Sequence, residues 1–399
     1  MSEMLRDLTV EEARARMLAS AIGTGVETVS LAGASGRVLA ETVTAQRDQP
    51  PFDASAMDGW AVRGAGGAFR IVGESAAGRG YRAPLQDGEA ARIFTGAPVP
   101  QGAERIVIQE EASREGEQVT TAPSDDAPRH IRPRGGDFQA GETLLEPGRR
   151  LDPWRLSLAA AAGREGLRVA RRPQVRVLST GEELVAPGWR PGPAQIFESG
   201  SPALAALIER WGGEAVVLER VGDDAEAIAR STAAAGGELI VTMGGASVGD
   251  HDLVKPALAR LGLVLRVETV RLRPGKPTWF GILDDGRRVL GLPGNPASAL
   301  VCAELFLKPL LLAMQGADPA LKLLSARLDG AAPANGPREH WARARLQSRD
   351  GGLWAQPMTD QDSSLVSVFA RADALIRCPS RMPASDTGAL VEVLPLERL

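Results

Sequence analysis

The chain has 399 residues, of which 44% are hydrophobic and 24% are charged. These proportions are typical of folded globular proteins and exclude a disordered or fibrous chain. At about 150 residues per domain, the length predicts two or three domains. The formal net charge of −4 excludes a positive field that would draw nucleic acids or anionic lipids to the whole protein. We therefore expect no nucleic-acid partner and no membrane partner.

The few cysteines and histidines argue against several kinds of site. The two cysteines, Cys302 and Cys378, cannot build a disulfide framework or a structural zinc site of the usual spacing. Three widely spaced histidines argue against a multi-histidine metal centre. The N-terminal residues do not resemble a signal peptide, and the most apolar stretch, 299–314, is interrupted by charged residues and a proline. A cytoplasmic location is the expectation.

In the first part of the chain, helix signals flank a region of short strands. A Thr-x-x-Glu capping box at 9–12 predicts a helix from Val10 to about Ser20. Residues 50–137 lack helical periodicity, which predicts a small, mostly β unit inserted into the chain. An Asp-Pro pair at 152–153 predicts the next helix start. The strands expected in the inserted unit include 69–72, 91–94 and 105–108.

Strands and helices alternate from Val175 to Leu311, which predicts parallel βαβ units with helices on both faces of one sheet. Helix starts are indicated at Ser201, at Asp223 or Asp224, and at Val254. After Met314 the pattern predicts a small β-barrel or sandwich. The expected extended segments are 175–178, 215–218, 239–243, 263–272, 340–346, 353–356, 374–378 and 390–394.

Three loops follow strands of the predicted parallel sheet, at the edge where such sheets bind ligands. They cover 179–184, 244–252 and 292–298. The glycines and Ser247 of the second loop can bring backbone N–H groups to a phosphate. Asp250 stands where a Walker A loop has its lysine, and an acid beside a phosphate favours a bridging Mg²⁺. An ordinary tight turn with solvated acids is the alternative.

Two further segments carry polar groups beside turns. Arg271, Arg273 and Lys276 surround a Pro-Gly turn, where they either bind a phosphate or oxyanion or form a solvated connection. In the inserted unit, the segments 50–61 and 95–98 are typical of ordinary turns when each is taken alone.

Six segments together resemble the molybdopterin molybdenumtransferase family, which contains MoeA and the E-domain of gephyrin. They occur in the family's order with compatible spacing and cover nearly the whole chain, so the combination is specific although each segment alone is not. The segments are PPFDASAMDGWAV (50–62), IFTGAPVPQGAERIVIQEE (93–111), LSTGEEL (178–184), GGASVGDHDLVK (244–255), RPGKP (273–277) and LPGNPASA (292–299).

The resemblance implies a multidomain α/β plus β protein. Its centre is a three-layer α/β molybdopterin-binding domain with a parallel sheet at 173–316. An N-terminal helical and mixed domain, 1–50 and 138–172, is split by an inserted, mostly β domain, 51–137, and a small β-barrel follows at 317–399. An elongated homodimer is also implied, in which each cleft lies between the α/β domain of one subunit and the inserted domain of the other.

The implied reaction is a step of molybdenum cofactor biosynthesis. Adenylylated molybdopterin and molybdate, with Mg²⁺, give molybdenum cofactor and AMP. The implied partners are a second copy of the chain, the adenylyltransferase of the preceding step and recipient molybdoenzymes. Two alternatives stay open: a molybdopterin adenylyltransferase, whose family shares the GGxSxG loop, and a divergent non-catalytic cofactor-binding or scaffold paralogue.

Matching positions to the family motifs implies a role for each candidate residue. Glu183, Asp223 and Asp252 are the expected metal ligands, and Arg343 and Ser363 fall near family positions in the last domain. The expected catalytic residues are Glu183, Asp252, Lys276, Arg273, Asp58 and Thr95. The expected cofactor-binding residues are Ser179, Thr180, Gly181, Gly244, Gly245, Ser247, Gly249, Pro293, Gly294, Asn295 and Ser298.

One position departs from the family pattern in a way that bears on the site. The family usually reads Asp-Ser-Asn where this chain has Glu198-Ser199-Gly200. An amide side chain is therefore missing beside the first loop, which would fit a divergent paralogue with an altered substrate or weakened activity. Arg273 also replaces a usual lysine, which keeps the charge but loses the compact ammonium group.

Overall fold

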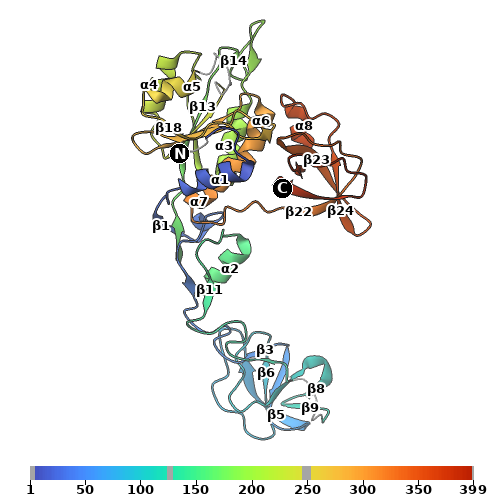
Figure 1. Ribbon diagram of the computed structural model, residues 1–399. Coiled ribbons are helices and arrows are strands. Elements are labelled where there is room, and N and C mark those ends of the chain that lie inside the picture. Colours follow the sequence, from blue (N-terminus) through green and yellow to red (C-terminus); the bar gives the residue numbers. More distant parts are fainter. Residues whose placement is uncertain (1–4, 124–128, 245–252, 398–399) are drawn as a thin grey trace.

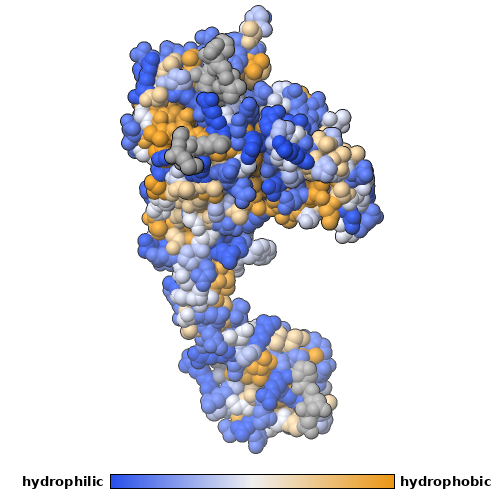
Figure 2. All heavy atoms as spheres, in the orientation of Figure 1, coloured by the Kyte–Doolittle hydropathy of each residue, from blue (hydrophilic) through white to orange (hydrophobic). Residues whose placement is uncertain are grey.

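The computed structural model of the protein describes residues 5–123, 129–244 and 253–397. An α/β domain and a C-terminal barrel lie side by side at one end of an elongated molecule, and a small β domain lies at the other end (Figure 1). A narrow connecting part joins the two ends, and the surface view shows the β domain standing apart from the rest (Figure 2). The expected multidomain α/β plus β fold is confirmed.

The α/β domain is built on a six-stranded sheet. Its strand order is β16 (Glu214–Val217), β13 (Gln174–Ser179), β17 (Leu239–Met243), β21 (Arg288–Leu292), β20 (Trp279–Ile282) and β18 (Val264–Val267). The first four strands run parallel, as predicted, whereas β20 and β18 are antiparallel to their neighbours. Residues 283–287 join β20 to β21, and this connection is too short for the crossover that parallel pairing needs. The sheet is therefore mixed.

Helices cover both faces of this sheet, because successive strand residues point to opposite sides. Val175 and Val177 pack in one core, and Leu178 packs in the other. The first core includes α3 (Gly200–Arg210) and α6 (Pro296–Cys302), and the second includes α4 (Ala225–Ala234) and α5 (Val254–Ala259). This arrangement gives three layers.

One long helix runs through the larger core. It continues from α6 through the π-helical turn η3 (Ala303–Leu307) into α7 (Lys308–Met314). The turn ends two residues before Pro309, which has no N–H to donate. In the part of the chain that the structure describes, this is the one helix long and apolar enough to cross a membrane. However, 83% of its apolar window is buried inside the protein, as expected for a core helix.

The first helix, α1 (Val10–Ala19), has the predicted capping box between Thr9 and Glu12. Its buried residues Val10, Ala13 and Met17 belong to the same core as α7. The helix therefore packs on the α/β domain and not on the connecting part that follows it in sequence.

The connecting part consists of paired strands and one helix. Asp152 caps α2 (Pro153–Ala161) as predicted, because its carboxylate accepts from the Arg155 backbone N–H at 2.8 Å. The remaining elements are β1 (Val26–Ser30) paired with β12 (Gly166–Ala170), η1 (Ala32–Ala34), and β2 (Val43–Thr44) paired with β11 (Thr143–Leu145).

The inserted β domain has a six-stranded sheet that contains the three predicted strands. Its order is β7 (Arg105–Ile108), β4 (Gly59–Val62), β6 (Glu89–Ile93), β5 (Gly67–Ser75), β9 (Gln118–Thr121) and β8 (Ala112–Glu115). A short pair, β3 (Ala54–Ser55) with β10 (Ile131–Arg132), and the turn η2 (Gln109–Glu111) complete it.

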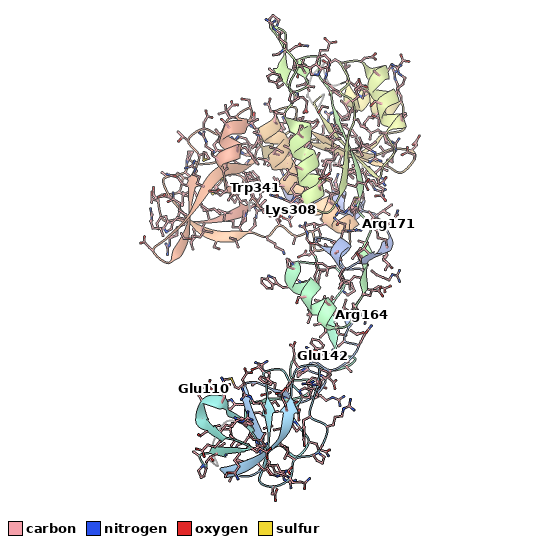
Figure 3. The ribbon with its side chains drawn as sticks, turned by 180° about the vertical axis from the view of Figure 1, so that it is seen from behind. Glu110, Glu142, Arg164, Arg171, Lys308 and Trp341 are labelled. Carbon is pink, nitrogen blue, oxygen red and sulfur yellow. The ribbon has the colours of Figure 1, made fainter. Side chains whose placement is uncertain are left out.

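The C-terminal domain is a closed five-stranded barrel, which confirms one of the two predicted forms. Around the barrel run β23 (Glu339–Arg349), β24 (Gly352–Pro357), β22 (Leu324–Leu328), β26 (Leu390–Pro395) and β25 (Ala374–Cys378), with α8 (Val366–Arg371) beside them. The two-residue strand β19 (Leu272–Arg273) comes from the α/β part of the chain and adds to β23. Trp341 of β23 and Lys308 of the core helix lie at the junction of the two domains (Figure 3).

Candidate active site

A cleft of about 1090 Å³ lies where the α/β domain meets the C-terminal domain. Its α/β wall consists of the loops that follow β13, β17 and β21, together with the turn after β19. Its other wall is the segment 361–364, next to α8. The predicted residues that line it are Thr180, Gly181, Glu183, Asp223, Gly244, Arg273, Lys276, Pro293, Gly294, Asn295 and Ser298.

The ends of the parallel strands form the floor of the cleft. The Thr180 N–H donates to the Met243 carbonyl at 3.0 Å, which ties the loop after β13 to the end of β17. Gly244 has φ +92°, and a Cβ there would lie 2.4 Å from the Thr180 carbonyl oxygen, so only glycine fits. The Thr180 hydroxyl is buried and has no hydrogen-bond partner among the described residues. A buried donor without a partner at a cleft wall is available to a ligand.

The missing amide at Gly200 is explained by its neighbour Met243. A Cβ on Gly200 would lie 2.1 Å from the Met243 Cε and 2.2 Å from its Sδ, so the thioether occupies the space of the side chain. Both residues line the cleft. Glu198 accepts from the N–H groups of Gly200 and Ser201 at 2.9 and 2.8 Å and so stabilises the start of α3. This part of the floor is filled by an apolar group.

The turn that carries the cations is anchored to the core helix. The Thr278 hydroxyl donates to the Gly275 carbonyl at 2.8 Å and lies 3.1 Å from the Cys302 Sγ. Burial raises the pKa of the Cys302 thiol to about 12, so this cysteine is a packing residue. Arg273 and Lys276, on either side of the turn, both line the cleft.

The C-terminal wall was largely missed by the sequence reasoning. The Asn295 amide donates to the Ser363 hydroxyl at 3.0 Å and links the two walls directly. Arg343 lies fully buried behind this wall, where its guanidinium donates to the Gln361 side chain at 3.2 Å and to the Asp362 carbonyl at 2.8 Å. No motif marked Gln361 or Asp362. The only available signal was the loose family match at Arg343 and Ser363.

An apolar side of the cleft was also missed. It comes from the short parallel strands β14 (Leu184–Val185) and β15 (Ile196–Phe197). Leu184, Ile196 and Phe197 line the cleft, and Ile196 and Phe197 are exposed. Two-residue strands in a Gly/Pro-rich segment leave too short a pattern to detect from sequence.

The carboxylates Glu183 and Asp223 lie in the cleft, but they do not form a complete metal cluster with other described residues. Within the described ranges, no group of three His, Cys, Asp or Glu side chains is placed to hold a metal ion. The predicted ligand Asp252 lies outside the described residues, as do Gly245, Ser247 and Gly249. Oxygen donors of this kind suit Mg²⁺.

Three of the predicted residues do not line the cleft. Ser179 is buried in its strand, where its hydroxyl lies 2.5 Å from that of Ser201. Asp58 and Thr95 lie in the inserted domain at the far end of the molecule (Figure 1). The Thr95 N–H and hydroxyl both donate to the Asp58 carboxylate at 2.7 Å, and these bonds hold the pKa of Asp58 below its ordinary value.

Family models match three successive parts of the chain. They are the MoeA N-terminal region (domain I and II) at 8–163, a probable molybdopterin binding domain at 176–313, and the MoeA C-terminal region (domain IV) at 325–396. The fold and the cleft therefore define a multidomain protein built around a molybdopterin-binding domain.

Relatives in sequence and structure narrow this class to one family. A Mycobacterium tuberculosis protein named molybdopterin molybdenumtransferase 2 is 38% identical over 388 residues, which cover 92% of this chain and 95% of the relative. A molybdopterin molybdenumtransferase of Nostoc is 34% identical over 340 residues, 82% of this chain and 78% of the relative. A solved MoeA structure from Pyrococcus horikoshii has a TM-score of 0.81 and 29% identity, and covers 99% of this chain and 100% of that one. The chain belongs to the molybdopterin molybdenumtransferase (MoeA) family of enzymes, and its function lies in molybdenum cofactor biosynthesis.

Proposed function

We propose that the chain inserts molybdate into adenylylated molybdopterin in a Mg²⁺-dependent reaction that releases AMP and molybdenum cofactor. The observation that carries this proposal is the convergence on one large cleft of cations, carboxylates and a buried hydroxyl that has no partner among the described residues. The cations include Arg273 and Lys276, the carboxylates include Glu183 and Asp223, and the hydroxyl is that of Thr180. Small-ligand sites usually measure about 300–1,000 Å³. A cleft of about 1090 Å³ therefore suits a substrate as large as a nucleotide-linked pterin.

The cleft residues divide into groups with different tasks. Arg273 and Lys276 bind the anionic groups of the substrate by charge-assisted hydrogen bonds. Thr180, Gly181 and Gly244 belong to the group that would bind a phosphate, for which Thr180 offers its hydroxyl and the glycines allow close approach to the backbone. The remaining residues of this group are Gly245, Ser247, Gly249, Pro293, Gly294, Asn295 and Ser298.

The acidic side of the cleft would hold the metal ion. Asp223, Glu183 and Asp252 are its proposed ligands, and a bound Mg²⁺ withdraws charge from the phosphate that is cleaved. Glu183 lies against Gly181, where any Cβ would come within 2.5 Å of its carboxylate. The carboxylate is therefore held close to the backbone that binds the phosphate.

Asp58 and Thr95 can contribute to a cleft only if that cleft belongs to a second copy of the chain. In one chain they lie at the end opposite the cleft (Figure 1), so any contact with the substrate has to come from the inserted domain of another subunit. We propose a homodimer in which each cleft is completed in this way, as closed two-fold assemblies allow.

The direct test supplies purified adenylylated molybdopterin, Mg²⁺ and either molybdate or tungstate, and follows AMP release. We expect release that depends on the oxyanion and on Mg²⁺, and that stops with a chelator. The comparison of the two oxyanions identifies the metal that is inserted. Transfer of AMP from ATP to molybdopterin without any oxyanion would instead show an adenylyltransferase, and binding without turnover would show a scaffold protein.

A further inference from the structure

The position of Arg273 in the cleft is set by the C-terminal barrel. Arg273 ends strand β19, which pairs in parallel with β23 so that Arg273 lies opposite His340. The Glu339 N–H donates to the Arg271 carbonyl at 2.9 Å, which fixes the register of this pairing. The side chains also meet, with the Arg273 Nη2 at 2.9 Å from the His340 Nδ1.

The electrostatic surroundings of His340 define the direction of this hydrogen bond. His340 is 7% exposed, and burial, with the neighbouring cations Arg273, Arg343 and Arg338, lowers its pKa to about 4. The ring is therefore neutral at physiological pH. A guanidinium can only donate, so Nδ1 accepts and the ring proton is on Nε2.

A neutral acceptor leaves the charge of Arg273 uncompensated, whereas a carboxylate would neutralise it. Among the described residues, Arg273 forms no ion pair, and its side-chain hydrogen bond is to His340. Glu339, the carboxylate next to His340 in sequence, pairs instead with Arg377 at 3.2 Å. The hydrogen bond orients the guanidinium without neutralising it. Its charge remains available to an anion in the cleft.

The surroundings of Arg273 show why orientation is needed. Arg273 lines the cleft and also a second cavity of about 390 Å³ inside the barrel, on whose wall His340 and Cys378 lie. Arg273 thus borders open space on two sides. Without a fixed acceptor, this long side chain would distribute between the two spaces.

We propose that His340 is a positioning residue, which holds the Arg273 guanidinium toward an anionic group of the substrate in the cleft and keeps its charge free. This inference rests on the proposed function for the identity of the anion, a phosphate or an oxyanion. It assigns to the barrel a part in substrate binding through one hydrogen bond across the domain junction.

The test compares His340→Ala with His340→Asn in AMP and tungstate binding and in AMP release. We expect His340→Ala to weaken binding and raise KM roughly tenfold with kcat changed less than threefold, since an ordering contact is lost. The Asn carboxamide oxygen can take the place of Nδ1, so His340→Asn recovers most of the affinity. The control is Cys378→Ala, opposite His340 in the β23–β25 pairing and on the same second cavity. We expect it to leave binding within twofold.

A double-mutant cycle with Arg273→Ala separates positioning from a purely structural effect. If His340 acts through Arg273, His340→Ala adds less than twofold to the loss that Arg273→Ala causes alone. Additive losses would overturn the proposal. So would failure of His340→Asn to recover binding while its thermal unfolding matches that of the wild type.

A spectroscopic measurement keeps this inference separate from the proposed function. The chain has three histidines, so ¹⁵N-histidine labelling gives few signals, and the His340 signal is identified by its loss in His340→Asn. We expect the neutral tautomer with the proton on Nε2, and a changed Nδ1 shift in Arg273→Ala. A proton on Nδ1 would overturn the inference even in an active enzyme. Absent AMP release with the expected tautomer would overturn only the proposed function.

Discussion

The cleft and the inserted β domain hold their polar residues in opposite ways. In the cleft, side chains from two domains of one chain converge, and Asn295 and Ser363 join the two walls at 3.0 Å. In the inserted domain, Asp58 and Thr95 satisfy each other and face solvent at the other end of the molecule (Figure 1). The cleft is therefore assembled within one chain, whereas any contribution of the inserted domain to it depends on a second chain.

The largest expected effect tests whether a second chain completes the cleft. We expect Asp58→Ala and Lys276→Ala each to lower AMP release by about 100-fold or more, because each removes a charged group from the proposed site. If the two groups come from different subunits, a mixed dimer of the two variants has one intact site of its two. Co-expression at equal levels should then restore about a quarter of wild-type activity. No recovery in dimers shown to be mixed would contradict the shared cleft.

The next effect tests how packing holds the turn between Arg273 and Lys276 at the cleft. Gly275 has φ +123°, and a Cβ there would lie 2.4 Å from the Cys302 Sγ in the core helix. Gly275→Ala should therefore lower the free energy of unfolding by roughly 2–4 kcal/mol and also weaken AMP binding. Chemical denaturation measures the first effect, and calorimetry the second.

The matched control for this prediction is Gly286→Ala. Gly286 has φ +85° with nothing within 4 Å of its added Cβ, so the variant has backbone strain without the clash. We expect a loss of about 1–2 kcal/mol with unchanged binding. Equal losses of unfolding free energy in the two variants would show that the clash with Cys302 does not affect stability.

A smaller effect tests the apolar floor of the cleft. In Gly200→Asn the new side chain should displace the flexible end of Met243 into the cleft and weaken substrate binding by roughly tenfold, with a change in unfolding free energy below about 1.5 kcal/mol. Adding Met243→Ala removes the displaced group and should restore most of the affinity. AMP binding is measured for Gly200→Asn and for the double variant. If the double variant binds AMP no more tightly than Gly200→Asn, this account of Gly200 is wrong.

The smallest effect concerns the polar pair in the inserted domain. The hydroxyl and the N–H of Thr95 lower the pKa of Asp58, so the carboxylate stays ionised to lower pH than an ordinary aspartate. Thr95→Val removes the side-chain bond, so the pKa of Asp58 should rise part of the way toward its ordinary value. Carboxyl NMR titration measures this shift, with Thr95→Ser as the conservative control. If Asp58 acts as a carboxylate, the acidic limb of activity should move to higher pH by the same amount.

Local sequence patterns predicted much of the fold. The capping box at Thr9, the Asp-Pro start of α2 and the alternation after Val175 each depend on neighbouring residues, and the structure confirms them. The antiparallel β20 and β18 were not predicted, because an apolar strand has the same pattern in either direction. The strands β14 and β15 were too short to show any period.

The candidate site was predictable only in part, for a related reason. Motif residues such as Thr180, Lys276 and Asn295 could be named from sequence because the loops after parallel strands meet at one edge of the sheet. The opposite wall at Gln361 and Asp362, which is more than 60 residues away in sequence from Asn295, carries no motif. Its place depends on how the barrel packs against the α/β domain.

Residue type and local spacing are enough to indicate the class of each domain, the family and the loops that line the cleft. Other features could be seen only in the folded chain: which groups share a cavity, that Met243 fills the space beside Gly200, and that Arg273 meets a neutral His340. The physical reason is that such contacts join residues far apart in the chain. Their distances are set by the packing of whole domains, which local patterns do not describe.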